Sequence, residues 1–282
     1  VTYLPQDVPL GLAHCVLIAR DFLGDDDFVM YLGDNLLREG VAELAKEFHA
    51  SGDVAAQILL ARVPDPHRFG VAQLDEAGRV VRLVEKPVHP PSDLALAGVY
   101  LFDGRVHEAV RSITPSARGE LEITDAIQWL IDHGHRVSSR VVEGYWKDLG
   151  TLDALLEGNR LVLETLERHV AGRIDEVSRI EGRVVVQPGA EVVRSTIRGP
   201  AIVGEGTRVV DSFIGPFSSV YHDCEVVRAE LEHSIVLERS RIADVGRITD
   251  SLVGKEVEVT RSARGPRAVR LMLGDHSRVD LV

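Results

Sequence analysis

Residues 197–220 read IRGPAIVGEGTRVVDSFIGPFSSV. Branched apolar residues recur in this stretch at intervals of six or five, namely Ile197, Val203, Val209, Ile214 and Val220. The same spacing continues outward in both directions over residues 186–259, and Gly or Pro follows several of the apolar positions. Neither an α-helix nor an antiparallel meander has this period. The spacing therefore predicts hexapeptide repeats, three to a triangular coil, with one apolar residue of each repeat pointing into a shared core.

This pattern resembles a left-handed parallel β-helix of imperfect hexapeptide repeats, and an ordinary β-sandwich is the less regular alternative. Upstream, residues 151–169 read as a helix, and residues 1–169 alternate apolar strands with helical periodicity, which is an α/β pattern. We expect strands at 28–32, 54–61, 80–84, 96–102 and 137–142. The first is wholly apolar and predicts a central parallel strand buried on both faces. Because 282 residues exceed one typical core, we predict two domains, 1–170 and 171–282.

Bulk properties exclude several classes of function. A formal net charge of -12 argues against a nucleic-acid polymer as partner, since phosphate backbones demand a concentrated basic surface. The sequence contains neither a long apolar run nor a signal-peptide layout, so we expect no membrane insertion and a cytoplasmic protein. Cys15 and Cys224 are the only cysteines and fit neither a disulfide framework nor a zinc spacing.

Two acidic residues follow predicted strands. Asp34 comes after the strand at 28–32, and Asp148 comes after the strand at 137–142 and Trp146. In an open α/β sheet, ligands bind beyond the carboxyl ends of the strands. Each acid alone could be a helix cap or a turn former. Together they could hold one Mg²⁺, which prefers oxygen ligands and leaves places for water and phosphate.

Other polar residues have both a functional and a structural interpretation. Lys86, before Pro87, could neutralise a substrate phosphate or form a surface ion pair. Arg118 could add a forked phosphate contact or cap the preceding helix. Gln6 and Gly11 could approach a nucleobase, or simply form a turn and a helix start. For Glu120 and Asp125, near a helix N-terminus, we favour a structural role.

Joined in order, the motifs resemble the sugar-1-phosphate nucleotidylyltransferases, and within them the long-form glucose-1-phosphate thymidylyltransferases that carry a C-terminal left-handed β-helix. The resemblance rests on Gln6 with Gly11-Leu12-Ala13, Leu32-Gly33-Asp34-Asn35, Phe69-Gly70-Val71, Val84-Glu85-Lys86-Pro87, Leu96-Ala97-Gly98-Val99-Tyr100, residues 119–125 and Trp146-Lys147-Asp148.

The resemblance implies that residues 1–170 form a nucleotidyltransferase domain with a Rossmann-like mixed sheet. It implies a Mg²⁺-dependent enzyme that makes dTDP-glucose and pyrophosphate from dTTP and glucose 1-phosphate, and we expect a homo-oligomer. Asp34 and Asp148 would hold the metal, and Gln6 and Gly11 would contact the base. Lys86 and Arg118 would contact the sugar phosphate, and Gly70, Glu85 and Gly98 the hexose. Asp34, Lys86 and Asp148 are the expected catalytic residues.

The family's Gly-rich phosphate loop has no match in residues 1–12, so the sheet is expected to be incomplete at the N-terminus and this fragment alone to be inactive. Three alternative functions stay open. The enzyme could use another nucleotide such as UTP, or add acetyl transfer on the β-helix, where His222 and His233 are the candidate bases. The chain could also be a non-catalytic regulatory relative that binds sugar nucleotides.

Overall fold

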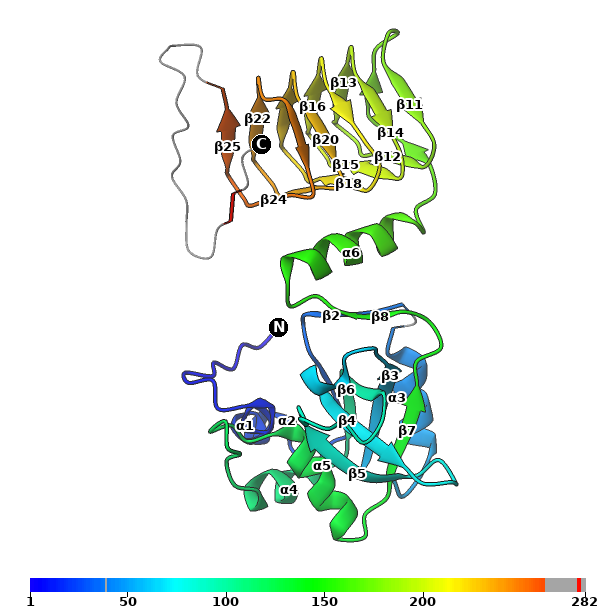
Figure 1. The fold of residues 1–282 in the computed structure, drawn as a ribbon, viewed down its shortest axis with the longest axis vertical. Coiled ribbons are helices and arrows are strands. Elements are labelled where there is room, and N and C mark those ends of the chain that lie inside the picture. The colour runs from blue at the N-terminus through cyan, green and yellow to red at the C-terminus, as the bar shows by residue number, and fades with distance from the viewer. Residues whose placement is uncertain (39, 262–277, 280–282) are drawn as a thin grey trace. The chain divides into compact units, whose positions relative to one another are not determined.

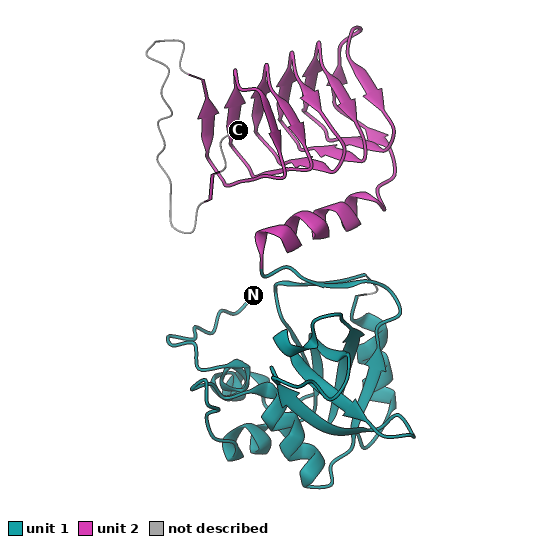
Figure 2. Ribbon diagram, viewed as in Figure 1, with its two compact units in different colours: residues 1–150 teal, residues 151–282 magenta. Residues whose placement is uncertain are grey.

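The computed structural model describes residues 1–38, 40–261 and 278–279. The chain divides into two compact units, Val1–Gly150 and Thr151–Val282 (Figure 2). Each unit has its own hydrophobic core, as expected for a chain of this length. The predicted boundary of independently folding domains at residue 170 stays a prediction.

A mixed sheet forms the centre of the first unit (Figure 1). Its order is β5-β4-β6-β3-β7, with β1 paired to β6. The bounds are β1 Phe28–Tyr31, β3 Ala56–Arg62, β4 Gly70–Leu74, β5 Val80–Glu85, β6 Leu94–Phe102 and β7 Val137–Val141. Only β3 and β7 pair in parallel, while the other pairs are antiparallel. All residues of β6 are buried, because strands lie on both sides of it and helices cover both faces.

Helices cover both faces of this sheet. Side chains of α1 Leu12–Ile18, α4 Val106–Ser112 and α5 Ile123–Asp132 pack on one face, and α3 Ala42–Ala50 packs on the other. The remaining helices are the short α2 Arg20–Leu23 and the 3₁₀ turn Pro66–Arg68. Alternation along the strands decides which face each residue joins. Ile58 and Leu60 lie under α5, for example, whereas Leu59 lies under α3.

The prediction of a central parallel strand at residues 28–32 is wrong. Strand β1 is antiparallel to β6, which is its only strand partner among the described residues. Its residues alternate between half-buried and exposed, and Val29 and Tyr31 face solvent. A short apolar run is compatible with either a central or a one-sided strand, and periodicity alone does not separate them.

A buried histidine lies under the β1 end of the sheet. His107 of α4 is 2% exposed and stacks against Phe28, and among the residues that the structure describes neither of its ring nitrogens has a hydrogen-bond partner. Burial lowers the pKa of His107, and the nearby Arg20 and Arg111 lower it further, against the opposing effects of the Gly24 carbonyl and Asp25. Burial therefore disfavours the charged form of the ring.

The second unit begins with α6 Leu152–Leu163, which Thr151 caps by accepting a hydrogen bond from the Ala154 amide at 3.2 Å. Within the unit, Asn159 of α6 donates to the Phe217 carbonyl and accepts from the Ser219 hydroxyl. Three parallel sheets then wind into a triangular coil (Figure 1). The hexapeptide prediction is thereby confirmed as a parallel β-helix, while its left-handed sense stays a prediction.

The strands of the three sheets follow one another around the coil. The first sheet contains β9 His169–Val170, β12 Val184–Val186, β15 Ala201–Val203, β18 Ser218–Val220, β21 Ile235–Val236 and β24 Leu252–Val253. The second contains β10 Arg173–Ile174, β13 Glu191–Val193, β16 Arg208–Val210, β19 Glu225–Val227, β22 Arg241–Ala243 and β25 Glu258–Thr260. The third contains β11 Arg179–Glu181, β14 Thr196–Arg198, β17 Phe213–Ile214, β20 Glu230–Glu232 and β23 Arg247–Thr249.

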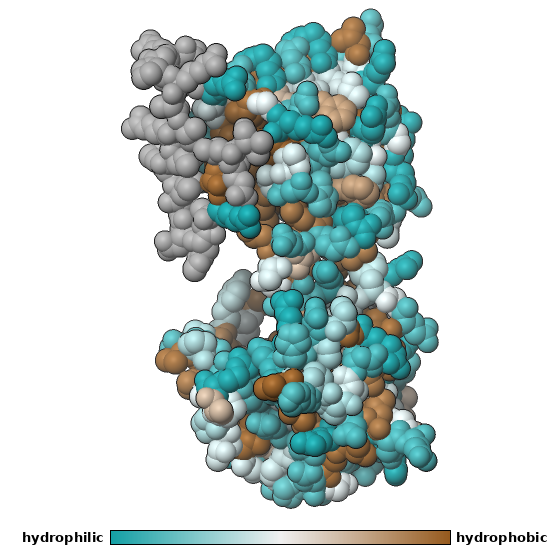
Figure 3. Space-filling model, viewed as in Figure 1, coloured by the Kyte–Doolittle hydropathy of each residue, from teal (hydrophilic) through white to brown (hydrophobic). Residues whose placement is uncertain are grey.

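The apolar repeat positions form the core of this unit. Ile197, Val203, Val209, Ile214 and Leu231 are all 0% exposed. Their outward neighbours are polar or only partly covered, as the mixed surface colouring in Figure 3 illustrates for one face. Across the parts of the chain that the structure describes, no helix has the length and apolar character needed to cross a membrane.

Candidate functional site

Two short strands bring Asp34 and Asp148 together. Strand β2 Asn35–Leu37 pairs antiparallel with β8 Trp146–Asp148, and Asn35 lies opposite Asp148. The Asp34 carbonyl accepts a hydrogen bond from the Leu149 amide at 2.7 Å, which extends this pairing by one step. Residues far apart in the sequence thus place their carboxylates at the same end of one two-stranded ribbon.

Both carboxylates face the space beside Gly150. A Cβ atom built on Gly150 would lie 3.0 Å from Asp148 Oδ1 and 3.9 Å from Asp34 Oδ2. The Gly150 amide donates to Asp148 Oδ1 at 2.8 Å and fixes that carboxylate. Glycine leaves the approach open where a side chain would fill it.

The donor set beside Gly150 fits Mg²⁺. Two carboxylates supply hard oxygen ligands, and this metal commonly takes its other ligands from water and substrate phosphates. Within residues 1–38, 40–261 and 278–279, no group of three or more His, Cys, Asp or Glu side chains could hold a metal ion. The predicted metal site therefore consists of a carboxylate pair, not of a complete protein cage.

Asn35 connects this pair to the rest of the site. Its amide nitrogen donates to Asp34 Oδ1 at 2.8 Å, and its amide oxygen accepts from Trp146 Nε1 at 2.6 Å. Its side chain lies against Gly98, where a Cβ would approach all three amide atoms to 2.7 Å. Gly98 also has φ +60°, in the left-handed region. Gly98, predicted to contact the hexose, thus makes room for Asn35, whose role the sequence analysis missed.

An aromatic contact leads from Asn35 to Lys86. The ring of Trp146 meets that of Phe69 edge-on, with centroids 5.5 Å apart. The Phe69 carbonyl accepts a hydrogen bond from the Lys86 amide at 3.0 Å. Lys86 is exposed and has φ +38°, an unusual conformation for a residue with a side chain. The backbone of the turn at the end of β5 is therefore tied to Phe69, and the Lys86 side chain on this turn is exposed.

Glu85 lies on the other side of this turn. It is opposite Gly70 in the β4–β5 ladder, and Thr124 Oγ1 donates to its Oε2 at 3.2 Å. A Cβ on Gly70 would lie 2.6 Å from Thr124 Cγ2 and 3.0 Å from Glu85 Oε2, so only glycine fits this position without a shift. Burial raises the pKa of Glu85, and the charge of Glu122 raises it further; Thr124, Lys86 and Arg118 act in the opposite direction.

Arg118 is surrounded by carboxylates. Its guanidinium lies 2.9 Å from Glu120, 3.4 Å from Glu122 and 3.5 Å from Glu85. Glu122 is 5% exposed and accepts a hydrogen bond from the Ser116 hydroxyl at 2.8 Å. The side chain predicted to contact a sugar phosphate is therefore oriented by acidic neighbours, while 41% of its surface stays accessible.

A cavity of about 520 Å³ lies between β5 and α5. Glu85, Glu122 and Asp125 line it together with residues of the β5 edge. Burial and the charge of Glu122 raise the pKa of Asp125. This hollow shares Glu85 with the predicted hexose contacts, and its other polar lining residues include the donors Arg82 and Gln128.

Gln6 and Gly11 lie together at the start of α1. Gln6 Nε2 donates to the Gly11 carbonyl at 3.2 Å and lies 2.9 Å from His14 Nδ1. Gly11 has φ +98°, and a Cβ there would lie 2.4 Å from the Leu121 carbonyl oxygen. The absence of a side chain at Gly11 therefore allows close packing against residues 119–122, which include Glu120 and Glu122 beside Arg118. Whether either residue contacts a base stays a prediction.

The two β-helix histidines are each paired with an aspartate. His222 Nδ1 lies 3.0 Å from Asp223, and His233 Nδ1 lies 2.6 Å from Asp250. Neither pair is part of the site described above.

Comparison with known proteins identifies close relatives. A family model described as nucleotidyl transferase matches residues 1–165. Glucose-1-phosphate thymidylyltransferases of Streptomyces griseus and Streptomyces antibioticus are each 56% identical over 281 residues, which cover 100% of this chain and 79% of each relative. A solved structure from Bacillus anthracis, described as a glucose-1-phosphate thymidylyltransferase with sucrose, is 37% identical with a TM-score of 0.51; the alignment covers 55% of this chain and 62% of that one.

Proposed function

The chain belongs to the nucleotidyl transferase family, and within it to the glucose-1-phosphate thymidylyltransferases; on this premise we propose that it makes dTDP-glucose and pyrophosphate from dTTP and glucose 1-phosphate. The observation that carries the proposal is the convergence of the Asp34 and Asp148 carboxylates beside Gly150. The contacts through Asn35, Trp146 and Phe69 join this pair to the backbone of the Lys86 turn, which supports a site that contains charges of both signs.

The reaction needs no protein nucleophile. A phosphate oxygen of glucose 1-phosphate, already ionised near neutral pH, attacks the α-phosphorus of dTTP. The bond from the α-phosphorus to the bridging oxygen breaks, and pyrophosphate leaves with that oxygen. Because no proton has to move, catalysis consists of positioning and of neutralising charge.

Each predicted residue has a role in this scheme. Lys86 and Arg118 would neutralise and orient the sugar phosphate. Glu85 would accept hydrogen bonds from hexose hydroxyls, with Gly70 and Gly98 leaving space for the ring, and Gln6 and Gly11 would contact the base. Asp34 and Asp148 would hold Mg²⁺, which when bound would offset the triphosphate charge and orient the α-phosphate.

We also propose that the protein is cytoplasmic and works with Mg²⁺. Both cysteines are free thiols in the structure, which suits a reducing compartment. Cell fractionation tests the location. Chelation followed by addition of single divalent cations tests the metal, and full recovery of turnover with Mg²⁺ alone is the expected result.

The decisive assay follows pyrophosphate release on the protein expressed from its natural start codon, across a panel of nucleotides and sugar phosphates. The pair dTTP and glucose 1-phosphate should give the highest kcat/KM. A clear preference for UTP, or release of thiol from acetyl-CoA with an amino-sugar phosphate, would reject the proposal in favour of another activity.

Substitutions at the carboxylate pair test the site. Asp34→Asn and Asp148→Asn should each lower kcat by at least about 100-fold with little change in the melting temperature, since both acids are at a solvent-accessible edge. Asp26→Asn, which makes the same replacement at an exposed loop acid, is the matched control and should keep full activity. Normal turnover in either site variant would remove that residue from the metal site.

A further inference from the structure

An alternating column of charges runs along the sheet of β10, β13, β16, β19, β22 and β25. Each strand begins with an outward charged residue in the same register: Arg173, Glu191, Arg208, Glu225, Arg241 and Glu258. Every neighbouring pair in the column forms an ion pair, for example Arg208 with Glu225 at 3.4 Å and Arg241 with Glu225 at 2.8 Å. The signs therefore read plus, minus, plus, minus, plus, minus from the first coil to the sixth.

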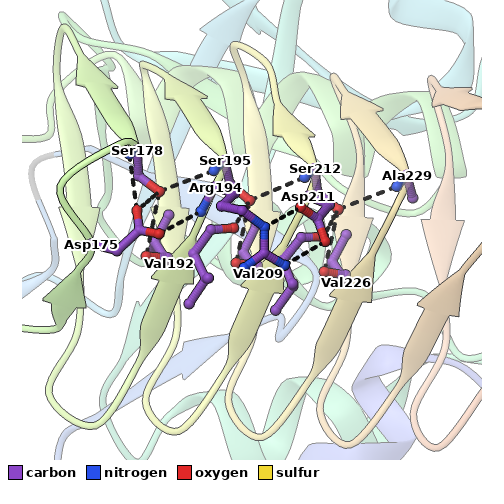
Figure 4. Close-up of polar contacts among 12 residues, drawn as sticks. Asp175, Ser178, Val192, Arg194, Ser195, Val209, Asp211, Ser212, Val226 and Ala229 are labelled. Carbon is purple, nitrogen blue, oxygen red and sulfur yellow. Dashed lines mark hydrogen bonds and ion pairs between the residues drawn. The ribbon is translucent and has the colours of Figure 1, made fainter.

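A second alternating column borders the same sheet at the corner that follows it. From the second coil to the sixth its members are Arg194, Asp211, Arg228, Asp244 and Arg261, while Asp175 of the first coil lies one position earlier, in the register of Val193. Arg194 forms a forked ion pair with Asp211, and Arg228 forms one with Asp244. Asp175 accepts a hydrogen bond from the Arg194 amide at 2.9 Å (Figure 4). From the second coil onward the signs here read plus, minus, plus, minus, plus, which is the inverse of the first column over the same coils.

An apolar stripe separates the two columns. In the four middle coils the outward positions between them are Val193, Val210 and Val227, which are partly exposed, and Ala243, which is buried; Asp175 and Thr260 occupy this register in the end coils. Beneath the corner, serine hydroxyls fix the coils to one another: Ser178 accepts from the Ser195 amide and Ser195 from the Ser212 amide, each at 3.0 Å (Figure 4). The result is a rigid face with an apolar centre and charged margins, the arrangement typical of protein interfaces.

This face is complementary to itself. A two-fold axis that crosses the coils between Arg208 and Glu225 reverses the order of each column. Arg208 then faces Glu225 of the second copy, and Asp211 faces Arg228 of the second copy. All six charges of the first column and the four charges that the second column has in coils two to five then meet their opposites, and Val210 meets Val227 of the second copy. An isologous dimer requires this kind of match between a surface and its own rotated copy.

We propose that two copies of this chain dimerise through the β10–β25 sheet face, with their coils antiparallel. Association covers the valine stripe, while each matched charge keeps its neighbours along the column and gains one opposite charge across the interface. The other two sheets lack this pattern: Asn159 of α6 bonds to Ser219 in the first, and Phe213 interrupts the charges of the third.

Sedimentation equilibrium on the full chain tests the proposal. The wild type should have twice the chain mass of 30.9 kDa. Val210→Glu and Val227→Glu should each give the chain mass, because a carboxylate in the stripe would have to be desolvated on association. Tyr221→Glu, which places the same charge at a more exposed apolar residue of the coil outside this sheet, is the matched control and should leave the dimer intact.

Charge exchange tests the antiparallel arrangement. Arg208→Glu and Glu225→Arg should each favour the monomer, since each creates like charges across the axis, and the double variant should restore the dimer. Circular dichroism checks that every variant keeps its coil. A monomeric or trimeric wild type overturns the proposal, as does a dimer that survives Val210→Glu. A folded double variant that stays monomeric also overturns it.

Discussion

Gly98→Ala is the sharpest test of how the site is assembled. Gly98 has φ +60°, where alanine costs about 1–2 kcal/mol relative to glycine. The new Cβ would also lie 2.7 Å from three side-chain atoms of Asn35, too close for any real contact. Asn35 must then move, and its hydrogen bonds to Asp34 and Trp146 are lost together. At about 1 kcal/mol each, these bonds roughly double the cost of the substitution.

Gly78→Ala is the matched control. Gly78 has φ +77° in the turn between β4 and β5, and a Cβ there meets nothing within 4 Å. This variant therefore carries the backbone cost without the collision. A difference of about 2 kcal/mol corresponds to roughly 4–8 °C in melting temperature for a unit of this size. Gly98→Ala should melt that far below Gly78→Ala in differential scanning calorimetry.

Turnover should separate the two variants further. Displacing Asn35 frees the Asp34 carboxylate, and a shift of about 1 Å in such a group can cost 100-fold in rate. Gly98→Ala should therefore lose about 100-fold in kcat, while Gly78→Ala keeps wild-type activity. The double variant Gly98→Ala/Asn35→Ala lacks the same two hydrogen bonds, so it should be about as unstable and as slow as Gly98→Ala. If Gly98→Ala matches Gly78→Ala in both measurements, Asn35 does not position the carboxylate.

Three further substitutions test other parts of the fold. Ile214→Ala in the β-helix core should lower the free energy of unfolding by about 2–5 kcal/mol in urea titrations, whereas Val177→Ala at an exposed position should leave it unchanged. The pKa of His107 in the folded chain lies below its ordinary value, so the unfolded chain binds the proton first as the pH falls. The free energy of unfolding should be greatest above about pH 6.5 and should decline below it, by at most about 1.4 kcal/mol per pH unit. His107→Phe should flatten this slope of unfolding free energy against pH. Phe48→Ala should reduce kcat as well as the free energy of unfolding, because Phe48 of α3 packs in one cluster with Leu37 and Trp146 of the β2–β8 ribbon. Unchanged turnover in a destabilised Phe48→Ala protein would show that the ribbon keeps its geometry without this packing.

The β-helix could be predicted from sequence because its core is encoded locally. Each coil buries residues at fixed intervals, and most coils repeat after 17 residues, as between Glu191, Arg208 and Glu225. The interval of five in place of six falls where a left-handed residue such as Arg194 or Asp211 turns the corner. The apolar period thus predicts which side chains point inward, how long each coil is and where its corners lie. No long-range pairing partner has to be known for this prediction.

The mixed sheet could be predicted only in part. The strand at 94–102 is a long apolar run, and its full burial follows from that. The run at 28–32 has similar composition, yet β1 is half exposed because its neighbours, not its own residues, decide how much of it is covered. Strand β4 was missed because Gly70 and Gln73 interrupt its apolar pattern, although Gly70 is required for the contact with Thr124.

The candidate site could be predicted from sequence only as a set of separate residues. The acids and glycines could be named because their residue types carry the chemistry. The contacts that bring them together in the folded chain could not be predicted. The pairing of Asn35 with Asp148 and the fit of Asn35 into the space above Gly98 both depend on strands that meet only in the folded chain. A side chain whose function is to hold another in place has no chemical signature of its own. The residues that touch substrate can therefore be predicted from a single sequence sooner than the residues that make those contacts possible.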